Sequence, residues 1–188
     1  RRLFLIGVDG RPCSRKSTLT DNLMEKLGAE ALFFDDFFIP QAAWPKDIKP
    51  ALPFPYIRDA EFVQGVKKLS QGLAFQYQPF DWHSQKLGNT KVIKPNGIII
   101  VEGVSVIREE IVSCFHKKIL VVSNIDNEFE AICEREKNIG ISNWKQLFLP
   151  SVELYWKTKP WERADILYAG RGITNKRRIL PSLTKAYP

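Results

Sequence analysis

The sequence predicts an α/β protein with a parallel β-sheet, and two observations support this prediction. Short apolar runs of strand length alternate along the chain with segments in which apolar residues recur at helical spacing. This alternation is typical of a parallel sheet flanked by helices. The chain has 188 residues, which suits one domain with a full core. We therefore expect a single domain across residues 1–188.

The first part of the chain contains two expected strands and two expected helices. Leu3–Val8 is an apolar run between polar residues, which predicts a buried strand. The next segment has apolar residues at helical spacing and a glycine that can end a helix: Leu19, Leu23, Met24, Leu27 and Gly28. Ala31–Phe34 is the second strand, and the proline-rich stretch Pro40–Pro55 should form a surface loop or lid. A second helix, marked by Phe62, Val66 and Leu69, should end near Gly72.

The second part of the chain continues the alternation. Gly97–Val101 is the clearest candidate for a central strand, and Lys118–Ser123 is another strand. Asp126 should cap a helix that extends to about Asn138. A further helix over Trp144–Lys157 should be interrupted by Pro150. The stretch ADILYAG, residues 164–170, should form the last strand.

Composition narrows the classes of function. The cysteines Cys13, Cys114 and Cys133 are too few and too scattered for a disulfide framework or a zinc site, which predicts a reducing, cytoplasmic setting. No apolar run is long enough to cross a membrane. The formal net charge of +7 suits an anionic ligand, and both nucleotides and nucleic acids qualify.

The stretch GVDGRPCSRKST, residues 7–18, joins the first expected strand to the first expected helix. Gly10, Lys16 and Ser17 have the spacing of a phosphate-binding loop, but Arg15 stands where the motif has its second glycine. Such a loop binds phosphate through backbone N–H groups, a helix N-terminus and the lysine charge. The motif requires the context that it has here, between a strand and a helix. The sequence therefore predicts a phosphate site, with an ordinary strand–turn–helix connection as the alternative.

Carboxylates follow three of the expected strands. Asp9 ends the first strand, Asp35 follows the second, and Glu102 follows the Gly97–Val101 run. Ligands of open α/β sheets bind at the carboxyl ends of the strands, so these side chains should gather beside the loop. Two of them, Asp35 and Glu102, suit a base for an attacking hydroxyl and a ligand for Mg²⁺. The alternatives are that Asp35 and Asp36 cap a turn and that Glu102 is a solvated strand end.

In order along the chain, these stretches resemble the uridine kinase family of P-loop kinases, whose relatives include nicotinamide riboside kinase and phosphoribulokinase. The likeness extends from Leu3 to about Gly170 and rests on six stretches: GVDGRPCSRKSTL, FDDFFIP, YQPFDW, VIKPNGIIIVEGV, the Trp–Pro–Tyr pattern of Trp144 to Tyr155, and KPWERADILYAG. The resemblance implies a three-layer P-loop NTPase fold with a parallel five-stranded sheet flanked by helices. It also implies lid-like insertions at about residues 40–58 and 134–145.

The resemblance implies roles for individual residues. Lys16, Asp35 and Arg135 would be catalytic: Lys16 at the β- and γ-phosphates, Asp35 as the base, and Arg135 at the transferring phosphoryl group. The metal ligands would come from Ser17, Glu102 and Asp35. ATP would lie along the loop residues: Gly10, Arg11, Pro12, Cys13, Ser14, Arg15, Lys16, Ser17 and Thr18. The substrate would contact a carboxylate and aromatic set: Asp36, Phe38, Tyr56, Phe80, Asp81 and Trp82.

The sequence departs from the family pattern at three places. Arg15 replaces a glycine, the stretch FPYIR of residues 54–58 lacks the nucleoside-binding aspartate, and only Arg135 and Lys137 remain of the basic residues in the closing helix. The expected function is an ATP- and Mg²⁺-dependent phosphotransferase that acts on a hydroxyl of a small molecule, such as the nucleoside uridine. A non-catalytic or weakly active nucleotide-binding relative is the alternative.

The expected partner is a small-molecule phosphate acceptor, without nucleic acid or membrane, and a homo-oligomer is left open. A nucleic-acid-binding protein is a third hypothesis, based on the basic stretch NKRR at residues 175–178.

Overall fold

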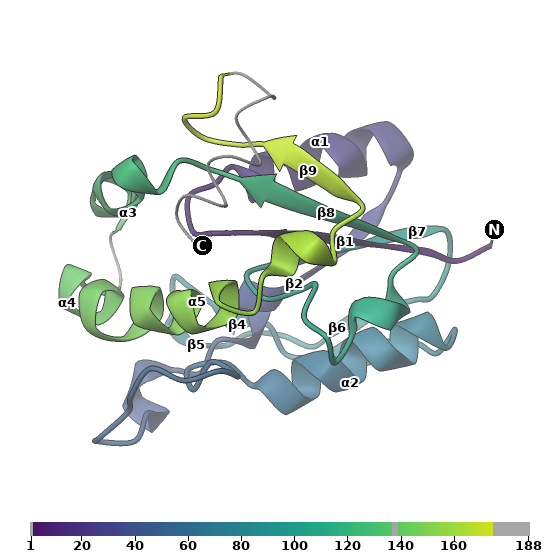
Figure 1. The fold of residues 1–188 in the computed structure, drawn as a ribbon. Helices are drawn as coiled ribbons and strands as arrows, with labels where there is room; N and C mark the ends of the chain where they lie inside the picture. Colours follow the sequence, from purple (N-terminus) through teal and green to yellow (C-terminus); the bar gives the residue numbers. More distant parts are fainter. Residues whose placement is uncertain (1, 137–138, 175–188) are drawn as a thin grey trace.

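A parallel five-stranded sheet forms the centre of the molecule, as the sequence predicts (Figure 1). This is a computed structural model, and it describes residues 2–136 and 139–174. The strand order is β2-β7-β1-β8-β9. The strands are β1 (Phe4–Gly10), β2 (Glu30–Phe33), β7 (Ile98–Gly103), β8 (Lys117–Val122) and β9 (Ile166–Ala169). The middle strand is therefore β1, and the Ile-rich run expected at the centre is its neighbour, β7.

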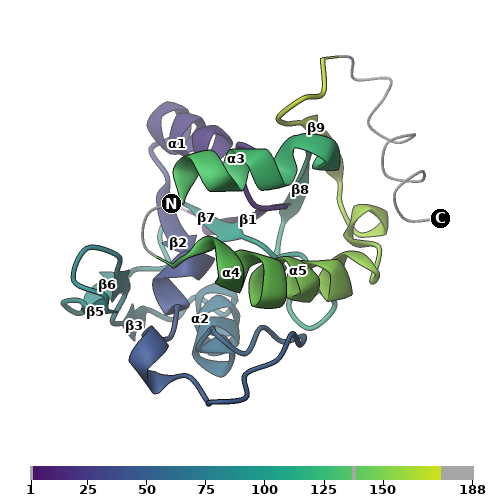
Figure 2. The same ribbon diagram turned by 90° about the vertical axis from the view of Figure 1, so that its left-hand side faces the viewer.

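Helices cover both faces of the sheet and make three layers (Figure 2). Helix α1 (Lys16–Leu27) lies on one face, where Leu23 and Met24 pack against a core cluster that includes Ile100. Helices α2 (Asp59–Ser70) and α5 (Leu149–Trp156) lie on the other face, which contains the larger core. Strand β7 supplies both cores because successive side chains of a strand point to opposite faces: Ile99 and Val101 to one, Ile100 to the other.

Register places the candidate site at one edge of the sheet. Glu102 of β7 pairs with Val8 of β1 and with Phe33 of β2. Strand β2 ends one residue earlier than expected, because Phe34 begins the 3-10 helix η1 (Phe34–Phe37). That short helix places Asp35 beside the carboxyl ends of the strands. The phosphate-loop segment leaves β1 at the same edge.

Small elements outside the sheet were not expected from the sequence. Two hairpins have strands of two or three residues, too short to show a period: β3 (Phe75–Tyr77) with β6 (Lys91–Ile93), and β4 (Phe80–Asp81) with β5 (Lys86–Leu87). The remaining short 3-10 helices are η2 (Gln41–Ala43), η3 (Val112–Cys114), η4 (Ile125–Asn127) and η6 (Pro160–Glu162).

Two expected helix signals were wrong. The cap that precedes α3 (Glu128–Arg135) is Asn124, whose side chain accepts a hydrogen bond from the Asp126 N–H at 3.0 Å. Pro150 does not interrupt a helix. It lies in the first turn of α5, and the helical backbone runs into it from the preceding residues. The preceding segment is helical, with α4 (Ile141–Asn143) followed by the π-helix η5 (Trp144–Phe148).

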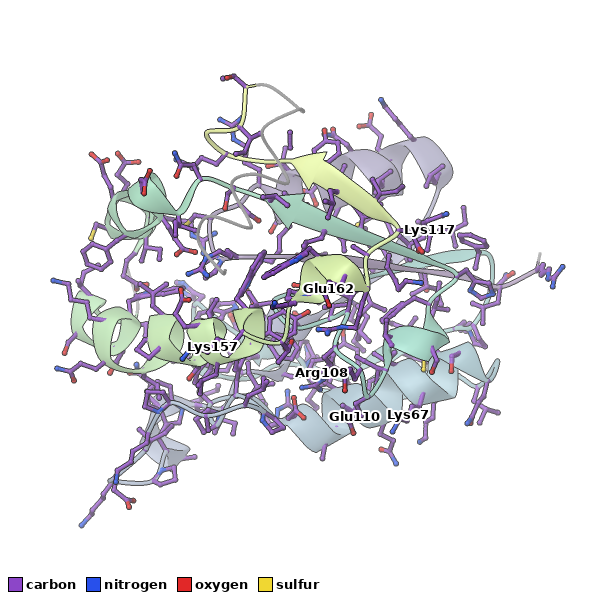
Figure 3. All side chains as sticks on the ribbon, in the orientation of Figure 1. Lys67, Arg108, Glu110, Lys117, Lys157 and Glu162 are labelled. Atoms are coloured by element: carbon purple, nitrogen blue, oxygen red, sulfur yellow. The ribbon has the colours of Figure 1, made fainter. Side chains whose placement is uncertain are left out.

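Ion pairs attach the segment after β7 to α2. The Arg108 guanidinium lies 2.7 Å from an Asp59 carboxylate oxygen, and Lys67 lies 3.8 Å from Glu110. Figure 3 shows Lys67, Arg108 and Glu110 next to one another along α2. In the part of the chain that the structure describes, no helix combines the length and apolar character needed to cross a membrane.

Candidate active site

The loop between β1 and α1 has the backbone geometry of an anion site. Cys13 and Arg15 adopt left-handed conformations, with φ of 56° and 76°, whereas Pro12 and Ser14 do not. Residues of alternating hand turn backbone N–H groups inward and form a concave anion-binding surface. Gly10 must be glycine, because a Cβ there would lie 2.7 Å from Ser14 Oγ and 2.8 Å from the Val121 carbonyl oxygen. The backbone of the loop thus has the shape that the sequence motif predicts.

A cavity of about 350 Å³ opens at this loop, and we call it the phosphate cavity. The loop residues 13–18 line it, together with Ala131, Glu134 and Arg135 of α3 and Arg171 beyond β9. Its charged side chains are four cations and one carboxylate: Arg15, Lys16, Arg135, Arg171 and Glu134. An excess of positive charge in a cavity attracts a polyanion such as a nucleoside triphosphate.

Lys16, Ser17 and Glu102 form a cluster beside the loop. Lys16 Nζ lies 3.7 Å from Glu102 Oε1, and Ser17 Oγ donates a hydrogen bond to Glu102 Oε2 at 3.4 Å. Burial raises the pKa of Glu102 to about 7; the positive charge of Lys16 opposes the shift and the negative charge of Asp35 adds to it. Glu102 lies near the end of β7, and Asp35 lies in η1 directly after the adjacent strand β2, so the predicted base and metal ligand are at the same edge of the sheet.

The oxygen atoms of this cluster suit a Mg²⁺ ion whose other ligands are phosphate oxygens and water. Among the described residues, no three His, Cys, Asp or Glu side chains are grouped so that they could hold a metal ion. Mg²⁺ commonly binds through one or two protein oxygens, several waters and substrate phosphates. The Ser17 hydroxyl and the Glu102 carboxylate supply protein oxygens of that kind.

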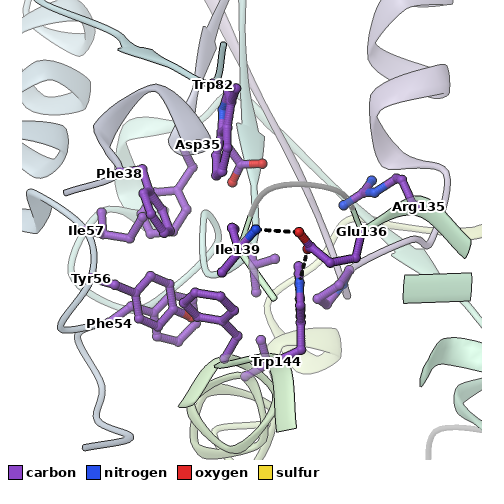
Figure 4. A pocket seen from close by; sticks show the side chains of 15 residues that line it. Asp35, Phe38, Phe54, Tyr56, Ile57, Trp82, Arg135, Glu136, Ile139 and Trp144 are labelled. Atoms are coloured by element: carbon purple, nitrogen blue, oxygen red, sulfur yellow. Dashed lines mark hydrogen bonds between the residues drawn. The ribbon is translucent and has the colours of Figure 1, made fainter. Parts of the chain in front are cut away.

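The structure has a second cavity, of about 380 Å³, which we call the acceptor cavity (Figure 4). Its lining is mostly aromatic and aliphatic: Pro12, Phe34, Phe38, Phe54, Tyr56, Ile57, Trp82, Val104, Ile139, Trp144, Phe148 and Val152. The charged residues of the lining are Asp35, Arg135 and Glu136. In Figure 4 the Asp35 carboxylate points toward the side of the cavity that carries Ile139 and Arg135. Arg135 lines both cavities, so the two cavities adjoin.

The two insertions expected as lids contact each other at the acceptor cavity. Glu136 accepts hydrogen bonds from the Ile139 N–H at 2.6 Å and from the Trp144 indole N–H. Gln41 of the first insertion donates to the Ile139 carbonyl oxygen at 3.3 Å. Ile139 is therefore hydrogen-bonded both within the second insertion and to the first.

Three of the expected substrate residues line the acceptor cavity and three do not. Phe38, Tyr56 and Trp82 belong to its lining. Asp36 instead accepts a hydrogen bond from the Tyr77 hydroxyl at 2.7 Å, and Phe80 is buried against Phe38 and Trp82. Asp81 accepts from the His83 N–H and the Ser84 hydroxyl, which closes the β4–β5 turn. Phe80 is therefore a core residue, and hydrogen bonds hold Asp36 and Asp81 outside the lining of the cavity.

Arg11, expected along ATP, directs its side chain into the protein. Its guanidinium binds Glu128 at 2.9 and 2.8 Å, also pairs with Glu153, and lies 5.5 Å from the Trp156 ring centroid. The side chain is 3% exposed and lines neither cavity. Pro12, expected beside it along ATP, lines the acceptor cavity.

Asp9 is also buried. The prediction that it faces the ligand beside Asp35 and Glu102 was wrong. It accepts from the N–H groups of Gly10, Ser105 and Ile107 and from the Tyr155 hydroxyl. Burial raises the pKa of Asp9, and these hydrogen bonds oppose the shift. Asp9 therefore connects the end of β1 to the segment after β7 and to α5.

Sequence reasoning missed Arg171 and Glu134 of the phosphate cavity and much of the apolar lining. Arg171 follows the last strand at the carboxyl edge of the sheet. Because ligands bind at that edge, its position could have marked it as a candidate site residue. Lys137 and the basic stretch 175–178 lie outside the described residues.

Comparison with known proteins supports the fold. No protein-family model matches the chain, and no curated protein sequence matches it. Solved structures do match. A possible uridine kinase from Bacillus stearothermophilus has a TM-score of 0.66 and 19% identity, with 89% of each chain covered. A candidate fructose transport system kinase from Silicibacter sp. TM1040 has a TM-score of 0.58 and 17% identity, over 89% of this chain and 90% of that one.

Shikimate kinase from Bacteroides thetaiotaomicron matches with a TM-score of 0.53 and 10% identity, over 98% of this chain and 96% of that one. The chain thus has the three-layer P-loop fold of small-molecule kinases, which confirms the fold that the sequence predicts. Within that class its structure is similar to that of the possible uridine kinase, in line with the resemblance seen in the sequence.

Proposed function

We propose that the protein is an ATP-dependent phosphotransferase that moves the γ-phosphoryl group to a hydroxyl of a small molecule, a nucleoside such as uridine. The observation that carries this proposal is the sharing of Arg135 by the two cavities, with Lys16 in one and Asp35 in the other. A donor phosphate at the loop and a hydroxyl in the acceptor cavity would meet at that boundary. Phosphoryl transfer needs such positioning above all.

Each residue of the site has a role in this proposal. Lys16 contributes a positive charge to the phosphates, and Arg135 binds the group that passes between the cavities. Ser17 and Glu102 would hold Mg²⁺, which when bound neutralises phosphate charge. Asp35 accepts the proton of the attacking hydroxyl, since its exposed carboxylate lines the acceptor cavity.

The acceptor cavity supports a nucleoside as the acceptor. Its aromatic lining suits a flat ring, which gains from stacked and edge-to-face contacts. Its volume of about 380 Å³ lies within the range of small-molecule sites. The matching structure described as a possible uridine kinase favours the same class of acceptor.

We also propose a cytoplasmic location, on the free thiols of Cys13, Cys114 and Cys133.

A coupled assay of ATP consumption tests the proposal directly. It should be run with uridine, cytidine, nicotinamide riboside, pantothenate and simple sugars as acceptors, beside the Lys16→Ala variant. We expect acceptor-dependent turnover with a nucleoside and none in Lys16→Ala. Stabilisation by ATP in a thermal-shift assay should also disappear in Lys16→Ala. Equal thermal shifts in both proteins would contradict the phosphate site.

A nucleotide-binding protein without transfer activity is the second candidate, and Arg15 favours it. An arginine in the left-handed conformation replaces the glycine next to Lys16 and lines the phosphate cavity. Its side chain lies where a phosphate would approach the loop. In the same assay this candidate predicts stabilisation by ATP without turnover for any acceptor.

A further inference from the structure

The segment after β9 contacts the backbone of the phosphate loop directly. The Arg171 backbone N–H donates to the Ser14 carbonyl oxygen at 3.2 Å, and Arg171 Nε donates to the Cys13 carbonyl oxygen at 3.2 Å. A Cβ on Gly170 would lie 2.4 Å from the Ser14 carbonyl oxygen, so only glycine allows this approach. The segment is itself anchored to the end of β8, since Gly170 donates to Val122 at 2.7 Å and Asn124 donates to Arg171 at 2.9 Å.

These hydrogen bonds act on the two peptide planes on either side of Ser14. A peptide unit is planar, so a hydrogen bond to its carbonyl oxygen fixes the orientation of the whole unit. The orientation of the first plane depends on the ψ angle of Cys13, and that of the second is coupled to the φ angle of Arg15. Cys13 and Arg15 are the two loop residues with a left-handed backbone, which is unfavourable for a residue with a Cβ. Arg171 therefore restrains the two positions at which the loop departs from favourable geometry.

We propose that Arg171 does the work that the second glycine does in a standard phosphate loop. A glycine would adopt the left-handed conformation without steric cost. Here Arg15 occupies the position, and Arg171 keeps the loop in its phosphate-binding shape from its place just beyond β9. Arg171 is thus a positioning residue for phosphate binding. The inference rests on the proposed phosphate site and adds a residue that determines its shape.

A double-mutant cycle on positions 15 and 171 tests the proposal. Affinity for Mg·ATP is measured by calorimetry for the wild type, Arg171→Met, Arg15→Gly and the double variant. In the wild-type background, Arg171→Met should weaken binding about tenfold, as for a lost hydrogen bond from a charged group. In the Arg15→Gly background the loss should be within about threefold, because a glycine at position 15 adopts its conformation without cost and the loop then depends less on the bond from Arg171 Nε to the Cys13 carbonyl oxygen. Both backgrounds lose the same positive charge, so their difference reports the restraint alone.

Equal losses in the two backgrounds would overturn the proposal, since Arg171 would then act only through its charge. No loss in either background would overturn it as well. Arg163→Met is the matched control. Its guanidinium also binds backbone carbonyls, those of Ile107 at 2.9 Å and Thr158 at 2.7 Å, but it lines neither cavity. That variant should leave the affinity for Mg·ATP unchanged.

A second measurement keeps the restraint testable without nucleotide. Cys13 lies in the loop and can be alkylated by iodoacetamide, with the exposed Cys133 as an internal reference. Arg171→Met should raise the alkylation rate of Cys13 relative to Cys133, and Arg163→Met should not. An unchanged ratio in Arg171→Met would overturn the proposal. If the wild type and Lys16→Ala alike fail to bind ATP, the proposed function fails, and the alkylation ratio still decides on the restraint.

Discussion

Neighbouring aspartates have different surroundings in this site. Asp35 is exposed and lines the acceptor cavity, whereas Asp36 binds the Tyr77 hydroxyl at 2.7 Å. Asp35→Asn should lower turnover by about 100-fold, because an amide cannot accept the proton of the hydroxyl. ATP should still bind, since the loop is not altered. Steady-state kinetics and calorimetry on the same preparation measure the two quantities.

Asp36→Asn is the matched control for this prediction. Its amide oxygen can still accept the Tyr77 hydroxyl hydrogen bond, so turnover should stay close to that of the wild type. If Asp36→Asn lost as much activity as Asp35→Asn, the assignment of Asp35 as the base would be wrong.

Glu102 makes the stability of the protein depend on pH. Burial raises its pKa from the ordinary 4.5 to about 7, so between these values the folded state binds more protons than the unfolded state. The free energy of unfolding should therefore fall as pH rises from about 4.5 to about 7, by about 3 kcal/mol at most. Glu102→Gln should remove most of this slope and be more stable than the wild type at pH 8. Urea unfolding at several pH values measures both effects.

The same substitution should weaken binding of Mg·ATP, because an amide is a poorer Mg²⁺ ligand than a carboxylate. Stability and ligand binding thus make opposite demands on this position. Parallel pH profiles for the wild type and Glu102→Gln would rule out Glu102 as the source of the slope.

At the level of elements, Arg11 joins the end of β1 to two helices. Its guanidinium binds Glu128 of α3 and Glu153 of α5, and both Arg11 and Glu128 are buried, at 3% and 6% exposure. Arg11→Met should lower the free energy of unfolding by about 3–5 kcal/mol, because it leaves the Glu128 charge buried without this partner. Urea unfolding at pH 7 measures the loss.

The double variant Arg11→Met/Glu128→Gln tests the cause of that loss. Removing both charges should recover part of the stability, since the uncompensated carboxylate is then gone. A double variant no more stable than Arg11→Met would mean that lost packing, including the contact with Trp156, accounts for the effect.

Elements with a clear period could be predicted from the sequence, and those set by single contacts could not. The five strands of the sheet and the helices α1 and α2 agree with the apolar patterns. The hairpins of residues 75–93 are too short for a period. The helix signals Asp126 and Pro150 misled because capping and the first helical turn depend on backbone geometry.

For the whole molecule, the net charge of +7 raises the question of nucleic-acid binding. Basic residues are spread along the chain, and they lack the aromatic interleaving of single-strand readers. We predict an affinity for a labelled 20-nucleotide single-stranded DNA weaker than about 1 µM at 150 mM salt, within the non-specific range. Fluorescence anisotropy measures it. A sub-micromolar affinity that falls steeply with salt would favour a nucleic-acid-binding protein.

The sequence by itself determined the strand and helix order and the phosphate loop with Lys16 and Ser17. These depend on apolar periodicity and on backbone groups, which neighbouring residues specify. Only the tertiary structure decided that Arg11 and Asp9 turn inward, that Asp36 lies away from the acceptor cavity, and that Arg171 reaches the loop. The direction of a side chain depends on what packs against it. In this fold those neighbours come from elements far away in the chain.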